Sequence, residues 1–222
     1  MNRAKIQGIG YSVPDRIVTN SELEKYMDTS DEWIQSRSGI KERRWVAPGM
    51  GTSDLAIDAS KKAIQMADID PQTIDLIIVG SLTSDYFFPG VSAQVQDALG
   101  ISPIGAFDVK AACSAFIYSL SIGDQFIQTG KFQTVLVIGA EVQSTALDMS
   151  TKGRDMAVLF GDGAGAVILK KHDGDSGILS THLHCQGKYL KELWCEGPTS
   201  RENPRISADM LKEGRHFPYM NG

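Results

Sequence analysis

The chain has 222 residues, of which 42% are hydrophobic, and a formal net charge of −5 at pH 7. This length and composition allow a sizeable core in one large domain or two small ones. The negative charge excludes a general attraction to nucleic acid or anionic lipid, so we expect small molecules or proteins as ligands. No apolar run approaches the ~18 residues of a membrane span, and the start MNRAKIQGIG lacks a signal peptide's apolar region. We therefore expect a cytoplasmic protein with no membrane partner.

The first half shows alternating strand and helix patterns. Apolar periodicity and turn residues predict a strand over 5–13, a helix over 53–67 capped by Ser53 or Asp54, a buried strand over 76–82, a helix from Pro89 to Gly100 and a short strand over 105–110.

The pattern continues with a helix from Cys113 to Thr129 that is apolar on nearly every face, which predicts a helix enclosed by protein all round. Strands are predicted over 134–142, 156–171 and 177–186, and an irregular polar excursion follows Gln186. Together these elements predict an α/β layered fold, with one mixed sheet and helices on its faces.

Cys113 lies in FDVKAACSAF, where a strand pattern gives way to a helix pattern. At a helix start, free backbone N–H groups and the helix dipole favour the nucleophilic thiolate. The small neighbours from Ala111 to Ala115 leave room for a ligand at the sulfur. However, free cysteines are often buried and only fill space, so position alone leaves both interpretations open.

The other two cysteines are Cys185 and Cys195, and the three form no CxxC pair. An odd number suits a reducing compartment better than a disulfide framework. The HLHC stretch places His182 and His184 on one face of the expected strand, with Cys185 opposite. No fourth ligand stands at a matching spacing, so we predict no metal site.

Two further stretches have local chemistry. In DEWIQSR, a short helix places Trp33 and Arg37 at i and i+4, so that an aromatic face and a cation fit a nucleotide. The alternative is a charged, solvated helix end with a half-buried tryptophan. GDGAGA, at 161–166, is followed by strand-like AVIL instead of a helix, which favours close backbone approach or a bulge over a phosphate loop.

Three motifs, in chain order TSDEWIQSRSGIKERR, DVKAACSAF and GDGAGAVIL, resemble β-ketoacyl-acyl-carrier-protein synthase III, a condensing enzyme of the thiolase-like superfamily. The resemblance runs from Lys5 to Gly222. It implies a thiolase-like layered fold made of two repeated halves. Residues 1–173 would be the amino-terminal half with the nucleophilic Cys113, and residues 174–222 the first strand and excursion of an incomplete second half that is largely missing.

The resemblance also implies an activity. Cys113 would take a short acyl group from coenzyme A, and a carbanion from decarboxylating malonyl-acyl-carrier protein would attack this thioester, which initiates type II fatty acid synthesis. The enzyme would be a homodimer with no cofactor and no metal. The alternatives are a quinolone or polyketide starter enzyme, a hydroxymethylglutaryl-coenzyme A synthase, or a non-catalytic partner that binds acyl-coenzyme A.

For individual residues, the resemblance implies that Trp33 and Arg37 hold the adenine end of coenzyme A. Thr29 would lie beside them, Arg154 would stack from the other side, and Arg43 and Arg44 would add positive charge. Phe160 would lie near the acyl pocket, and Phe88 would cross the dimer interface into the partner's pocket, unless it is plain core.

The family supplies a catalytic His and Asn from its second half. His172, His182, His184 and His216 do not match that position, so we expect the 222 residues alone not to complete condensation.

Overall fold

The computed structural model describes residues 3–221, which form two compact units. The first contains the residues up to Pro14 together with Val46–Val142 and Asp162–Leu183. The second contains Asp15–Trp45, Gln143–Gly161 and the residues from His184 onward. The boundary predicted between residues 173 and 174 separates two repeated halves and does not separate compact units. It therefore stays a prediction.

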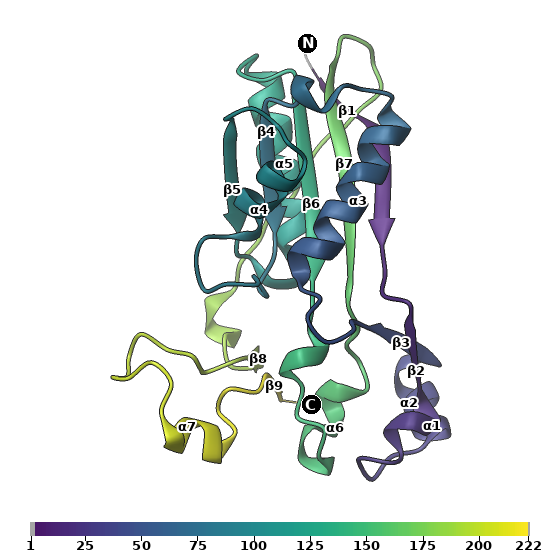
Figure 1. Cartoon of the computed structure of the whole chain (residues 1–222), viewed down its shortest axis with the longest axis vertical. Coiled ribbons are helices and arrows are strands. Elements are labelled where there is room, and N and C mark those ends of the chain that lie inside the picture. The colour runs from purple at the N-terminus through teal and green to yellow at the C-terminus, as the bar shows by residue number, and fades with distance from the viewer. Residues whose placement is uncertain (1–2, 222) are drawn as a thin grey trace. The chain divides into compact units, whose positions relative to one another are not determined.

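The first unit is built on a five-stranded sheet in the order β1-β7-β6-β4-β5 (Figure 1). β4 runs parallel to β5 and β6, whereas β7 is antiparallel to β6 and β1. An α/β fold with a mixed sheet is thus confirmed. The strands are β1 (Arg3–Ser12), β4 (Leu76–Gly80), β5 (Gly105–Val109), β6 (Thr134–Glu141) and β7 (Gly163–His172).

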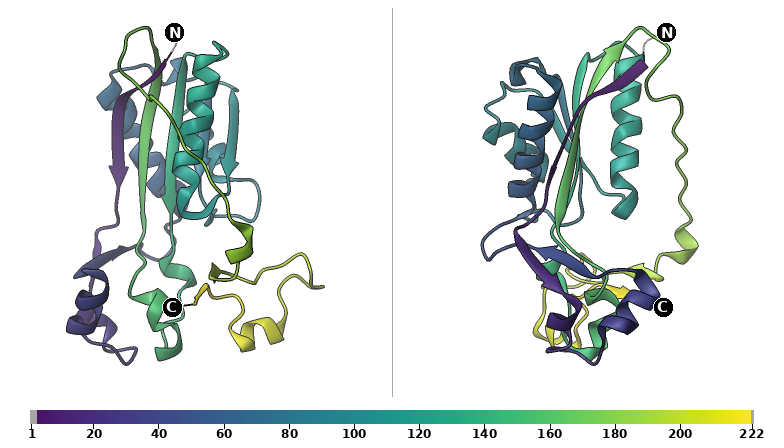
Figure 2. Two further views of the ribbon diagram at one scale, coloured as in Figure 1. Left: turned by 180° about the vertical axis from the view of Figure 1, so that it is seen from behind. Right: turned by 90° about the vertical axis from the view of Figure 1, so that its right-hand side faces the viewer.

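Helices cover both faces of this sheet. α3 (Thr52–Ala67) and α4 (Val91–Ala98) lie on one face, and α5 (Ala115–Gln128) lies on the other (Figure 2). Side chains alternate between the faces along each strand. Ile77 and Val79 of β4 join the core under α3 and α4, while Leu76 and Ile78 join the core under α5. β4 is therefore buried on both sides, as its continuous apolar run predicts.

α5 is not enclosed all round in this structure, which differs from the expectation. Its face toward the sheet is buried, including Ala115 and Ile127, but Ile117 is 47% exposed. The extended chain after β7 covers part of the helix, since Ile178 packs in the same core and Ser121 Oγ lies 2.9 Å from Thr181 Oγ1. One sheet and one extended segment cannot cover a helix that is apolar on nearly every face.

The structure corrects two other elements. The strand predicted over 156–171 begins only at Gly163, and a short helix, α6 (Arg154–Ala157), precedes it. The strand predicted over 177–186 is wrong: Ile178 N donates to Ala4 O at 2.8 Å, but the segment then follows α5 and has no ladder partner. His182 and His184 accordingly share no strand face.

Carboxylates from a loop and from β5, distant in the sequence, accept from the first amides of α3 and α4. The N-cap residue of α3 is Gly51, so neither Ser53 nor Asp54 occupies that position. Asp54 still contributes to the cap, because its Oδ2 accepts from Gly51 N at 2.8 Å. Ser53 N donates to Asp85 Oδ2 at 3.0 Å, and at α4 the amides of Val91 and Ser92 donate to Asp108 at 2.7 and 2.9 Å. These bonds satisfy amides that have no partner within their own helices.

The second unit packs short elements around a small core that includes Val18, Leu23, Ile34 and Met156. A ribbon of two antiparallel strands carries two helices in the loop between them. The elements are β2 (Arg16–Thr19), α1 (Asn20–Leu23), α2 (Asp31–Ser38), β3 (Glu42–Trp45), α6, β8 (Leu193–Trp194), α7 (Ala208–Glu213) and β9 (Tyr219–Met220).

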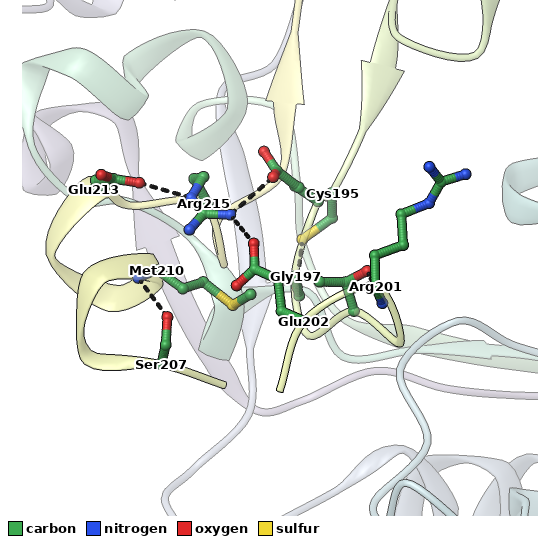
Figure 3. Close-up of polar contacts among 10 residues, drawn as sticks. Cys195, Gly197, Arg201, Glu202, Ser207, Met210, Glu213 and Arg215 are labelled. Atoms are coloured by element: carbon green, nitrogen blue, oxygen red, sulfur yellow. Dashed lines mark hydrogen bonds and ion pairs between the residues drawn. The ribbon is translucent and has the colours of Figure 1, made fainter. Parts of the chain in front are cut away.

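The polar excursion after Gln186 is organised around Arg215 (Figure 3). Its guanidinium donates to Glu196 at 2.9 Å, to Glu202 at 2.5 Å and to Glu213 at 2.7 Å. Hydrogen bonds to these carboxylates, first to Glu202, raise the pKa of Arg215. The network connects three separate turns of this segment.

Candidate active site

Cys113 stands at a sharp junction between β5 and α5. A 3-10 turn, Ala112–Ser114, connects them, and Ala112 adopts φ 49°, a left-handed conformation that is uncommon for residues other than glycine. Such strained backbone recurs at functional sites. The Cys113 side chain is exposed, which contradicts the space-filling alternative. The thiol is therefore open to a ligand and lies just before the first turn of a 14-residue helix.

Glu141 stands at the same edge of the sheet. β4, β5 and β6 are parallel, so their carboxyl ends meet at the edge where the chain turns toward Cys113. The Glu141 carboxylate accepts hydrogen bonds from Leu82 N at 2.6 Å and Thr83 Oγ1 at 3.0 Å. Burial raises the pKa of Glu141, although these bonds act against the rise. The sequence analysis did not single out Glu141. The feature that marks it is a carboxylate near the end of the apolar stretch VIGAEV.

The loop between β4 and α4 ends in exposed aromatic side chains. Tyr86, Phe87 and Phe88 are 60%, 71% and 78% exposed, so the plain-core alternative for Phe88 is wrong. Glu141 holds the start of this loop, and Asp85 in its middle accepts from Ser53 N and from Ser53 Oγ at 3.0 Å. The aromatic side chains are thus displayed on an anchored loop.

In the second unit, Trp33, Arg37 and Arg154 come together, and we call these three residues the clamp. The guanidinium carbons of Arg37 and Arg154 lie 4.7 and 4.4 Å from the Trp33 ring centroid. Arg37 shares α2 with Trp33, whereas Arg154 opens α6, more than a hundred residues later. Ser30 caps α2 by accepting from Trp33 N at 3.1 Å. Two cations on one aromatic ring suit a ligand that is both planar and anionic.

Unpaired polar atoms also lie at the clamp. Arg154 Nη1 donates to Asp28 O at 2.8 Å, which leads directly to Thr29. Thr29 Oγ1 and Arg154 Nε are buried atoms that have no hydrogen-bond partner within residues 3–221. Arg154 Nε does lie 3.8 Å from Asp155 Oδ1, an ion-pair distance, so Thr29 Oγ1 is the atom of the two without any such neighbour.

A cavity of about 460 Å³ opens beside the clamp. Val158, Leu159 and Met220 supply its apolar wall, and the clamp supplies the aromatic and cationic groups. The combination of one aromatic face, two guanidinium groups and an apolar wall is suited to a nucleotide with an attached chain. Met220, in β9, is a wall residue that sequence reasoning missed, and no local pattern marks it.

Phe160 and the glycine-rich segment have mainly structural contacts. Phe160 is half-buried against the core of the second unit, and its carbonyl accepts from Trp45 Nε1 at 3.1 Å. Gly163–Ala166 belong to β7, so no phosphate loop forms. A Cβ at Gly161 would lie 3.2 Å from Arg44 O, which confirms close backbone approach there.

Across residues 3–221, no group of three or more His, Cys, Asp or Glu side chains is placed to hold a metal ion. In the same part of the chain, no helix combines the length and apolar character that membrane crossing requires.

Comparisons with known proteins agree on one family. The family described as 3-oxoacyl-[acyl-carrier-protein (ACP)] synthase III matches residues 107–187. A β-ketoacyl-[acyl-carrier-protein] synthase III from Xanthomonas campestris pv. campestris (strain 8004) is 50% identical over 191 residues, 86% of this chain and 58% of that protein. One from Bradyrhizobium sp. (strain BTAi1) is 46% identical over 218 residues, 96% of this chain and 66% of that protein.

The fold comparison agrees with the sequence comparison. The crystal structure of 3-oxoacyl-[acyl-carrier-protein] synthase III from Aquifex aeolicus VF5 matches with a TM-score of 0.86 and 41% identity, over 99% of this chain and 65% of that one. The chain thus spans about three fifths to two thirds of the length of the relatives it matches.

Proposed function

Since the chain belongs to the β-ketoacyl-acyl-carrier-protein synthase III family, we propose that it is part of an acyltransferase that condenses a short acyl-coenzyme A with malonyl-acyl-carrier protein. The matched relatives are longer than this chain, and the resemblance assigns the carbanion-stabilising His and Asn to their second half. The 222 residues would then perform acyl transfer, and the second half would be needed for condensation. The proposal includes a cytoplasmic homodimer that uses no cofactor.

In the proposed first step, the Cys113 thiolate attacks the thioester carbon of acyl-coenzyme A. A carbon–sulfur bond forms, the tetrahedral intermediate collapses, and the coenzyme A thiolate leaves with the electron pair of the broken bond. The observation that carries this proposal is the exposed thiol of Cys113 at the amino end of α5.

The clamp would bind the nucleotide of coenzyme A, with Thr29 beside it. Support comes from the two guanidinium groups on Trp33 and from the cavity that these residues line. Phe88 would enter the partner subunit's acyl pocket and Phe160 would lie near the pocket of its own subunit. The exposure of Phe88 on an anchored loop supports the first of these roles.

Acylation of Cys113 tests the acyl-transfer step. We expect incubation with acetyl-coenzyme A to place one acetyl group on Cys113 and none on Cys185 or Cys195, because only Cys113 combines exposure with the amino end of a long helix. Peptide mapping by mass spectrometry measures this, with Cys113→Ala as the control. Acetyl label that survives in Cys113→Ala would overturn the proposed nucleophile. Coenzyme A binding without any label would favour the non-catalytic alternative.

A further inference from the structure

Arg43 is a buried cation whose partners are all neutral. The ERR sequence on a short ribbon predicts surface charge, yet Arg43 is only 6% exposed. Its Nη1 donates to Val18 O at 3.1 Å, and its Nη2 donates to Asn20 Oδ1 at 2.6 Å and to Val158 O at 3.1 Å. Burial lowers the pKa of Arg43, and its Nε lacks a hydrogen-bond partner in the described chain.

Burial of Arg43 without a neighbouring anion contributes little to the stability of the folded chain. Removing a guanidinium from water without a neighbouring anion is costly, and an apolar side chain of similar volume would often serve packing equally well. The planar guanidinium does offer several donors in fixed directions, which neither lysine nor an apolar residue can imitate. The hydrogen bonds of Arg43 connect separate elements of the second unit, and these connections explain an arginine at this position.

One connection leads to α6. Val158 is the residue that directly follows α6, and it is fully covered by the core of the second unit. The bond from Arg43 to Val158 O therefore holds the end of the helix whose first residue is Arg154. Because α6 has only four residues, its position depends on such outside contacts.

The other connection leads to α2. The Asn20 amide, which accepts from Arg43, donates through Nδ2 to Asp31 Oδ1 and to Ile40 O, both at 2.8 Å. Asp31 is the first residue of α2, and its other carboxylate oxygen accepts from Gln35 Nε2 at 2.6 Å. Asn20 thus ties Arg43 to both ends of the segment that carries Trp33 and Arg37.

We propose that Arg43 is a positioning residue for the clamp: its guanidinium sets the spacing between α2 and α6, and so holds Arg154 against Trp33. Arg43 itself does not contact the ligand. The inference rests on the proposed nucleotide-binding role of the clamp and assigns that site a buried support. Its consequence is that changes at Arg43 alter nucleotide recognition more than thiol chemistry.

The test uses the full chain with Arg43→Lys and Arg43→Met. The control is Arg16→Met, which removes an arginine from the adjacent strand. Its ion pair with Glu22 is partly exposed, and its guanidinium lies 5.5 Å from the Trp45 ring centroid and does not contact the clamp. Clamp geometry is followed without any ligand by ¹⁹F NMR of protein labelled with 5-fluorotryptophan. The Trp33 signal is assigned with Trp33→Phe, and Trp194 serves as the internal reference.

We expect both Arg43 variants to shift or broaden the Trp33 signal while the Trp194 signal stays in place. Coenzyme A affinity, measured by calorimetry, should fall about ten-fold or more, the scale of a lost hydrogen bond to a charged group. Acylation of Cys113 should slow through a raised KM with acetyl-coenzyme A, yet stay nearly unchanged with acetyl-N-acetylcysteamine, which has no nucleotide. Arg16→Met should change none of these.

Variants that fail to fold do not end the test. Asn20→Leu is nearly isosteric and cuts the connection to α2 while it leaves the bond to Val158, so it should also perturb the Trp33 signal. If the Arg43 variants only lower the melting temperature, with an unchanged Trp33 signal and equal losses for both donors, Arg43 is merely structural and the proposal is overturned. If the wild-type chain does not bind coenzyme A, the proposed function is wrong, and the fluorine spectra still decide whether Arg43 sets the clamp.

Discussion

Glu141 shows how a single residue acquires its properties from distant neighbours. In sequence it is an acid at the end of an apolar strand, which suggests a solvated strand end. In the structure its carboxylate accepts from Leu82 N and Thr83 Oγ1, some 59 residues away in the chain, and burial raises its pKa. The protonation of Glu141 therefore affects the loop that displays Phe88.

The raised pKa of Glu141 predicts a pH dependence of stability. In the unfolded chain its pKa is near the ordinary value of about 4.3, so the folded protein holds the proton more tightly. The stabilising contribution is fully present below about pH 4.3 and is lost as the pH rises through the raised value. Glu141→Gln lacks this loss, so the stability of wild type relative to the variant should fall as the pH rises. Urea unfolding at several pH values measures the difference, and parallel profiles would contradict the prediction.

A substitution at Trp33 tests whether the clamp binds the nucleotide. Trp33→Ala removes the ring on which both guanidinium groups lie. We expect the KM for acetyl-coenzyme A to rise roughly ten-fold, in line with ~1–2 kcal/mol for a desolvated cation–π contact. Acylation by acetyl-N-acetylcysteamine should persist, because Trp33 would bind the nucleotide and take no part in the chemistry. Equal losses with the two donors would show that Trp33 is structural.

At the scale of elements, the packing of α3 on β1 depends on glycine. Gly8 and Gly10 lie two residues apart and both face α3. A Cβ on Gly10 would collide with Ala59 O and lie 2.8 Å from Lys62 Cβ. The GIG motif therefore lets helix backbone approach strand backbone. A neighbour in the sheet offers a contrast: Gly165, paired with Tyr11, has no atom within 4 Å of the position that a Cβ would occupy.

This contrast predicts that substitution of glycine by alanine has a large effect at Gly10 and a small effect at Gly165. Gly10→Ala should lower the free energy of unfolding by about 3 kcal/mol or more, because backbone atoms cannot move aside as a flexible side chain can. Gly165→Ala should change it by less than about 1 kcal/mol. Urea unfolding of both variants measures the effect. Similar losses at the two positions would show that the strand conformation, instead of the α3 contact, requires glycine.

At the scale of the whole molecule, the side chains of α5 leave an apolar surface uncovered in the chain. Ile117 is 47% exposed on this helix, while Leu120 and Phe126 are half-buried. Exposed apolar surface favours association, so we predict that copies of the chain associate through this side of α5. The sequence pattern predicts a helix enclosed all round, and within residues 3–221 this face of α5 is not enclosed.

Ile117→Lys should therefore reduce self-association. We expect a smaller weight-average mass in sedimentation at the same concentration and nearly unchanged thermal stability, because Ile117 contributes little buried area. Gln125→Lys, at another exposed position of α5, is the charge-matched control and should leave association as it is. An equal effect of both substitutions would attribute the change to net charge and not to the apolar surface.

Features that depend on neighbours close in sequence were determined by the sequence alone. The alternation of strands and helices follows from local apolar periodicity, and the thiol at the β5–α5 junction follows from the change of that periodicity. The pairing of Trp33 with Arg37 also needs only helical spacing. The motifs identified the family, because three of them occur in the family's order.

Only the tertiary structure decided what depends on distant segments. Arg43 lies in a charged tripeptide yet is buried, because Asn20 and Val158 surround it from other parts of the chain. Asp85 and Asp108 accept from the first amides of α3 and α4 although they lie elsewhere in the chain. The strand predicted over 177–186 fails for a related reason. A strand requires a partner beside it, and the local pattern of a segment cannot show whether the fold brings one.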